Sequence, residues 1–107
     1  MLTALVLSLF CQFDDPFIRG DCFHTGFIES EDAFAIVNYA FRGTYQPTCL
    51  DTCDVNDDGR IGITDFIHML HFLFVNGRPP SAPYPACGND PTSDIYDCDQ
   101  YNSVFCR

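Results

Sequence analysis

Apolar residues recur at helical spacing in two stretches of the chain, residues 31–41 and residues 65–74. The apolar positions are Phe34, Val37, Ala40 and Phe41 in the first stretch, and Phe66, Ile67, Leu70, Leu73 and Phe74 in the second. Because positions three and four apart share one face of an α-helix, each stretch predicts an amphipathic helix. Two such faces, packed antiparallel, would bury each other and form the core.

The two stretches belong to an internal duplication with an offset of 33 residues. The offset superposes Gly26 on Gly59, Ile28 on Ile61 and Asp32 on Asp65. Each copy is predicted to be a loop followed by one helix, with Ser30 and Thr64 as N-caps and Gly43 and Gly77 as C-terminal stops. We expect Ile28 and Ile61 to point into the core, where a short backbone pairing would couple the two loops.

The loop before the second helix carries the strongest chemical signal. Its twelve residues, 54–65, place oxygen-bearing side chains at positions one, three, five and twelve and a glycine at position six, the pattern with which a chain wraps one Ca²⁺. The predicted ligands are Asp54, Asn56, Asp58, the Arg60 carbonyl and Asp65. Oxygen ligands without Cys or His favour Ca²⁺ over zinc, and Mg²⁺ prefers to keep its waters. The alternative is a polar turn that binds nothing.

The corresponding loop of the first copy predicts a weaker metal site. Phe23 stands at its third position and cannot act as a ligand. The remaining oxygen donors are Asp21, the Thr25 hydroxyl, the Phe27 carbonyl, Glu29 and Asp32. Fewer charged ligands lower affinity for Ca²⁺. The alternative is a loop without an ion, kept in shape by Phe23 and a disulfide.

Seven cysteines are spread over a chain of 107 residues, which is too short to depend on a hydrophobic core alone. No CxxC pair is present, so the pattern indicates disulfides in a secreted protein rather than a zinc or redox site. The predicted disulfide cysteines are Cys22, Cys49, Cys53, Cys87, Cys98 and Cys106, which can pair in 15 ways. Cys11 is then a removed residue, a free thiol, a lipid anchor or an intermolecular bridge.

These observations divide the chain into three parts. Residues 1–18 begin with an apolar run that is too short to span a membrane, and form a signal peptide or a retained assembly segment. Residues 19–77 hold the duplicated calcium-binding unit. Residues 78–107 form a Cys- and Pro-rich tail that is neither helix nor central strand. We expect this tail to be pinned on the domain by disulfides, although a flexible linker is the alternative.

The net charge of −10 excludes nucleic acid as a partner, because the chain would repel a phosphate backbone. No nucleophile elbow, HExxH motif or glycine-rich phosphate loop is present, and we therefore expect no enzyme. The tripeptide Arg19-Gly20-Asp21 matches a cell-adhesion motif, but Asp21 already has a role at the first position of its loop.

The two loop–helix copies resemble type I dockerin repeats, because each has Asp at the twelfth position, Asp32 and Asp65, and lacks the first helix of an EF-hand. The resemblance implies a small, mostly α fold of two antiparallel F-hand units in a secreted bacterial protein. It also implies recognition of a cohesin domain along the helices and through the tenth and eleventh loop positions, here Ser30-Glu31 and Ile63-Thr64.

Two functions follow as hypotheses. The first is an extracellular calcium-binding structural protein that assembles with itself as a filament subunit, using the apolar residues 1–13 as the contact. The second is a dockerin-type adaptor that binds a cohesin-like receptor domain.

Overall fold

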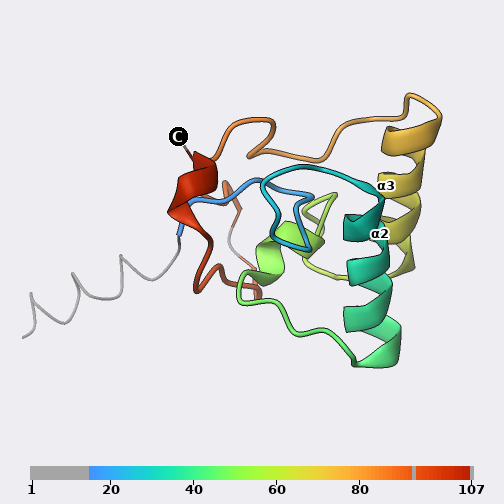
Figure 1. The fold of residues 1–107 in the computed structure, drawn as a ribbon, viewed down its shortest axis with the longest axis horizontal. Helices are drawn as coiled ribbons and strands as arrows, with labels where there is room; N and C mark the ends of the chain where they lie inside the picture. The colour runs from blue at the N-terminus through green and yellow to red at the C-terminus, as the bar shows by residue number, and fades with distance from the viewer. Residues whose placement is uncertain (1–14, 93, 107) are drawn as a thin grey trace, which may run out of the picture.

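The computed structural model describes residues 15–92 and 94–106 and contains two α-helices there, α2 (Ser30–Val37) and α3 (Ile63–Phe74). α2 continues into a π-helical turn at Asn38–Arg42, and short 3₁₀ turns span Leu50–Cys53 and Ser103–Cys106. The two helices run side by side in opposite directions at one end of the molecule (Figure 1). All the secondary-structure elements of the described residues are helices or helical turns. The prediction of a small, mostly helical fold is therefore confirmed.

Each helix begins one or two residues earlier than the sequence pattern predicts. The N-caps are Glu29 and Gly62, so the assignment of Ser30 and Thr64 as caps is wrong. The reason lies in the third residue of each helix, an aspartate. Asp32 accepts a hydrogen bond from the Glu29 N–H at 2.7 Å. Asp65, its counterpart in α3, accepts a hydrogen bond from the Gly62 N–H at 2.9 Å. Each carboxylate thereby satisfies a backbone donor that the helix leaves free, and this places the helix start.

The buried face of α2 differs from the predicted face. Phe34 and Phe41 are each 59 % exposed, and the residues in the core are Ala33, Ala35 and Ile36. In α3, Met69 is fully buried, whereas Phe74 is 67 % exposed. The buried side chains of Asp32 and Asp65 fix how each helix is rotated about its axis. In this rotation, several large apolar side chains of the periodic pattern lie on the outer face.

Ile28 and Ile61 are half-buried and pack against the core between the helices, as expected. The predicted backbone pairing between them is replaced by another contact. The Ile61 N–H donates to the hydroxyl of Tyr96 at 3.2 Å. The β-bridges of the described residues instead join the tail to earlier segments, Phe17 to Gly88 and Cys49 to Cys98.

Three disulfides join the parts of the chain. Cys22–Cys53 links the two loops at corresponding ends, Cys49–Cys98 ties the Leu50–Cys53 turn to the tail, and Cys87–Cys106 closes the tail on itself. A second apolar cluster of Phe17, Ile18, Cys49, Cys98 and Tyr101 surrounds the middle bridge. The tail is therefore held against the domain by covalent and apolar contacts. Cys11 and the apolar run at residues 2–10 lie outside the described residues.

No helix of the described residues is long and apolar enough to cross a membrane.

Candidate metal centre

The loop of residues 54–65 is folded around the carboxylates at its two ends. Asp54 accepts hydrogen bonds from the N–H groups of Asp58 at 3.3 Å and Gly59 at 2.9 Å. Asp65 accepts them from Asn56 at 3.3 Å and Gly62 at 2.9 Å. Gly59 has φ of +82°, a conformation that other residues adopt only with strain. The chain is thus drawn into a closed loop in which both terminal carboxylates face inward.

Three of the predicted ligands converge in this loop. Carboxylate oxygens of Asp54, Asp58 and Asp65 lie within 4.8 Å of one another, close enough to share one cation. Asp54 and Asp65 are completely buried, whereas Asp58 is exposed. Asn56 is on the same loop, where its Oδ1 accepts the Asp58 N–H at 3.2 Å. The Arg60 N–H donates to Asp58 Oδ1 at 3.0 Å, which folds the chain back toward the cluster.

The buried carboxylates of this loop resist ionisation when no cation is bound. Burial, with Asp65 and Asp58 nearby, raises the pKa of Asp54 to about 7. Burial also raises the pKa of Asp65 to about 6, with a smaller contribution from Asp58. Like charges in a low-dielectric interior repel, and a positive ion among them removes both penalties. The arrangement can therefore hold a metal ion, and its acidic oxygens suit a hard cation.

The first loop repeats the same hydrogen-bond framework. Asp21 accepts from the N–H groups of Thr25 at 3.0 Å and Gly26 at 2.8 Å, which match Asp58 and Gly59 of the second loop. Asp32 accepts from Phe23 at 2.8 Å in the same way that Asp65 accepts from Asn56. Gly26 has φ of +90°, close to that of its counterpart. The duplication seen in the sequence is therefore also a duplication of backbone geometry.

The two loops differ in the side chain that bonds to the first carboxylate. In the first loop, the hydroxyl of Tyr101 donates to Asp21 Oδ2 at 2.6 Å, a contact between residues 80 positions apart. The hydroxyl of Thr25 donates to the carbonyl of Phe27 at 3.1 Å, so these two predicted ligands bond to each other. Glu29 is exposed. In the described part of the chain, no group of three metal-binding side chains includes a residue of this loop.

Arg19 connects the second loop to the tail and is the largest fully buried side chain. Its guanidinium donates to the carbonyls of Asp51, Asp54 and Ala82 and to Asp90 Oδ1, at 2.8 to 3.1 Å. A buried arginine with these partners cannot serve as part of an adhesion tripeptide. Sequence reasoning did not identify this role, since its partners lie between 32 and 71 residues away.

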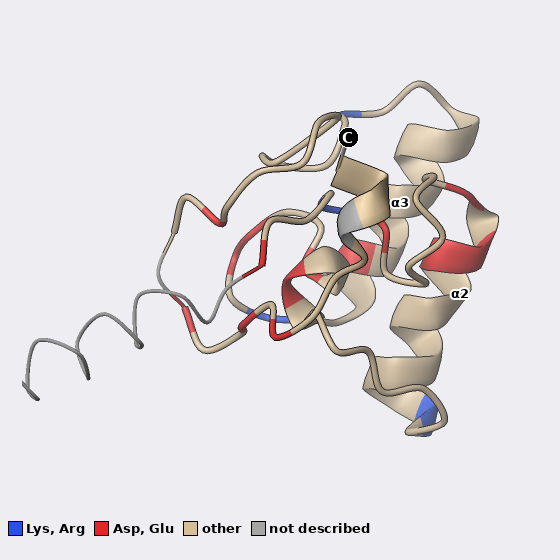
Figure 2. Ribbon diagram, turned by 60° about the vertical axis from the view of Figure 1, so that its left-hand side comes forward, with Lys and Arg blue, Asp and Glu red and all other residues tan. Residues whose placement is uncertain are grey.

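Acidic residues occur along the loops beside the helices and along the tail (Figure 2). Asp51, Asp57, Asp90 and Asp94 form carboxylate groups next to the predicted ligands, and the sequence pattern does not include them. They come together only because the tail folds over the second loop, so no spacing along the chain signals them.

No protein-family model matches this chain, and neither a curated protein nor a solved structure shows significant similarity to it.

Proposed function

We propose that the protein is an extracellular structural module that binds one Ca²⁺ in the loop of residues 54–65 and serves in protein–protein association. The observation that carries this proposal is the convergence of Asp54, Asp58 and Asp65 around one point, with two of the three completely buried. Asn56 and the carbonyl of Arg60 would add neutral oxygens from the third and seventh positions. A set of five oxygen donors without nitrogen or sulfur favours Ca²⁺.

The first loop has a different role in this proposal. The neutral hydroxyl of Tyr101 donates a hydrogen bond to Asp21, where an ion would otherwise bind the carboxylate. A buried carboxylate that accepts three hydrogen bonds is stabilised without a cation. The first loop therefore has a structural role, with at most a low affinity for Ca²⁺. Its weaker set of predicted ligands is Asp21, Thr25, Phe27, Glu29 and Asp32.

The outer face of the first helix supports a role in association. Phe34 lies on α2 and Phe41 in the π-helical turn that continues it, and each is more than half exposed. Phe23, Phe34 and Tyr45 line an adjacent groove of about 330 Å³. Exposed aromatic side chains that cluster in this way are typical of docking surfaces. Three disulfides support residence in an oxidising, extracellular compartment.

Two kinds of partner are compatible with this face. Self-association into a filament would use it together with the apolar residues 1–13, which lie outside the described residues. A dockerin-type adaptor would instead present this face, with the exposed Phe34 on α2, to a cohesin-like receptor domain. The resemblance to dockerin repeats remains an interpretation of the loop pattern.

Calcium titration of the disulfide-intact chain tests the metal site. We expect calorimetry to detect Ca²⁺ binding that Asp65→Asn weakens at least tenfold, because this residue closes the loop. Asp99→Asn is the matched control, since it makes the same change at an exposed aspartate outside the carboxylate groups. Equal affinity for Ca²⁺ in the wild type and Asp65→Asn would refute the site.

Sedimentation velocity tests the association. Self-assembly predicts a concentration-dependent rise in sedimentation coefficient that Phe34→Ser reduces. A wild-type chain that stays monomeric at high concentration would exclude self-assembly and leave the adaptor function.

A further inference from the structure

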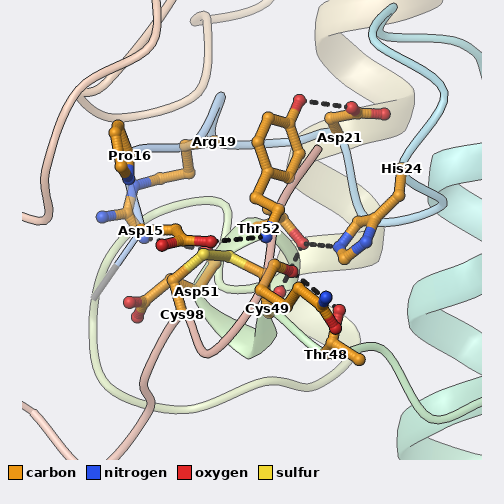
Figure 3. Close-up of a disulfide and its surroundings, with 12 residues drawn as sticks. Asp15, Pro16, Arg19, Asp21, His24, Thr48, Cys49, Asp51, Thr52 and Cys98 are labelled. Atoms are coloured by element: carbon orange, nitrogen blue, oxygen red, sulfur yellow. Dashed lines mark hydrogen bonds between the residues drawn. A yellow bond between two sulfur atoms is a disulfide. The ribbon is translucent and has the colours of Figure 1, made fainter. Parts of the chain in front are cut away.

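A second group of carboxylates lies where the tail crosses the Leu50–Cys53 turn. Oxygens of Asp51, Asp90 and Asp94 lie within 4.8 Å of one another. None of these residues belongs to the predicted ligand set of either loop. Asp51 precedes the calcium loop, next to the Cys49–Cys98 disulfide (Figure 3), whereas Asp90 and Asp94 come from the tail. The group therefore joins two segments that are about 40 residues apart in the sequence.

Asp51 has an unsatisfied oxygen inside this group. The residue is 1 % exposed, and its Oδ1 is buried without a hydrogen-bond partner. A buried anionic oxygen without a partner is costly, and native proteins almost always pair such an atom. Arg19 does not serve it, because Arg19 Nη1 donates to the backbone carbonyl of Asp51 rather than to its carboxylate. The atom lacks a positive partner.

The charge balance around Asp51 is also incomplete. The single guanidinium of Arg19 lies 3.0 Å from Asp90 and 3.6 Å from Asp57. Apart from Asp54 of the first site, the carboxylates of Asp51, Asp57, Asp90 and Asp94 gather here, and Arg19 forms ion pairs with only two of them, Asp57 and Asp90. These four carboxylates leave three negative charges in excess of the one guanidinium when all are ionised. Asp90 and Asp57 side chains are only 8 % and 7 % exposed, so water screens these charges poorly. A divalent cation would offset most of the excess.

We propose that a second divalent cation binds between Asp51, Asp90 and Asp94 and fastens the tail to the calcium loop. The ligands are carboxylate oxygens, which favour Ca²⁺ among the common divalent ions. Asp51, Asp90 and Asp94 are not among the predicted ligands of the first site, although an oxygen of Asp94 also lies within 4.8 Å of Asp54, so the two sites adjoin. The task of the second ion is to hold the tail over the loop. Burial, with Asp90 and Asp94 nearby, raises the pKa of Asp51 to about 8, which agrees with a position that needs a counter-charge.

The rival arrangement is a proton held between Asp51 and Asp90, with no metal. The two arrangements predict different stoichiometry. Native mass spectrometry of the full, disulfide-intact chain in Ca²⁺ is expected to show two bound ions for the wild type and for the control Asp99→Asn. Asp94→Asn removes a half-buried ligand at the edge of the tail and is expected to retain one ion. Unchanged stoichiometry and affinity in Asp94→Asn would overturn the proposal.

The Asp65→Asn variant keeps this test separate from that of the first site. It is expected to lose the ion of the calcium loop and to retain the ion at Asp51. If the proposed calcium loop is wrong, Asp65→Asn will bind as many Ca²⁺ ions as the wild type, with the same affinity. If the second site is wrong, Asp94→Asn will do so instead.

Thermal unfolding of Asp51→Asn gives an independent readout. In chelator, this variant is expected to be as stable as the wild type or more stable, because it replaces a buried carboxyl group whose Oδ1 has no hydrogen-bond partner. In saturating Ca²⁺ it is expected to be less stable than the wild type, because it has lost a ligand. If the melting temperatures of the wild type and Asp51→Asn differ by the same amount with and without Ca²⁺, the shared proton is indicated and the metal site is overturned.

Discussion

The hydrogen bond between Tyr101 and Asp21 is expected to be a major support of the first loop. Tyr101 is 4 % exposed, and its hydroxyl donates to a fully buried carboxylate at 2.6 Å. Tyr101→Phe removes only the hydroxyl. The ring keeps its edge contacts with His24, at 5.4 Å between centroids, and Phe105, at 5.8 Å. The variant therefore isolates one hydrogen bond to a charged group.

The size of the effect follows from that geometry. A hydrogen bond to a buried charged group contributes about 1.5 to 3 kcal/mol. The unfolding entropy of a chain of 107 residues is about 0.22 kcal/mol/K, from about 2.1 cal/mol/K per residue. The melting temperature of Tyr101→Phe is thus expected to fall by about 7 to 13 °C. Excess Ca²⁺ is not expected to restore it, because the first loop gathers no third carboxylate in the described residues.

Circular dichroism melts of the two chains at one calcium concentration measure this change. Tyr39→Phe is the matched control, since the Tyr39 hydroxyl makes no hydrogen bond within the described residues and its loss is expected to cost less than about 0.5 kcal/mol. If Tyr101→Phe melts within about 2 °C of the wild type, the carboxylate of Asp21 is satisfied by other groups and the reasoning fails.

Two further predictions concern protonation and packing. Burial raises the pKa values of Asp32 and Asp54 to about 7, against about 3.9 in an unfolded chain, so the chelated protein is expected to lose stability as the pH rises from about 4 to about 7. Melts in chelator at pH 5 and pH 7.5 measure this, and a higher melting temperature at pH 7.5 would contradict it; saturating Ca²⁺ is expected to oppose the trend, since the ion competes with protons. Met69→Ala is expected to lower the free energy of unfolding by about 2 to 5 kcal/mol in denaturant titrations, because the side chain is fully buried. Phe74→Ala, on the exposed side of the same helix, is the control, and an equal loss in both variants would show that the described packing is wrong.

The loops and the approximate helix positions could be predicted because their determinants are local. Asp54, Gly59 and Asp65 stand within twelve residues of each other, and the same spacing recurs around Asp21 and Asp32. A carboxylate at the first position, a glycine with positive φ at the sixth and a carboxylate at the twelfth close a loop through nearby N–H groups. Such contacts depend little on the rest of the fold.

The rotation of the helices could not be read from apolar periodicity alone. Phe34 and Phe41 have the spacing of core residues, yet Ala33 and Ile36 are buried in their place. The rotation of α2 is set by Asp32, whose buried carboxylate accepts hydrogen bonds from the Phe23 and Glu29 N–H groups. Leaving a buried carboxylate without donors costs more free energy than exposing an aromatic ring, so Phe34 lies on the outer face.

The amino-acid sequence by itself determined the duplicated loops, the carboxylates within them and the need for disulfides, because these depend on neighbouring residues and on composition. Tertiary structure alone decided the pairing of the cysteines, the burial of Arg19, the bond from Tyr101 to Asp21 and the carboxylate group at Asp51. Each of these joins segments that are distant along the chain. Their proximity results from the packing of the tail over the loops, and no local pattern encodes it.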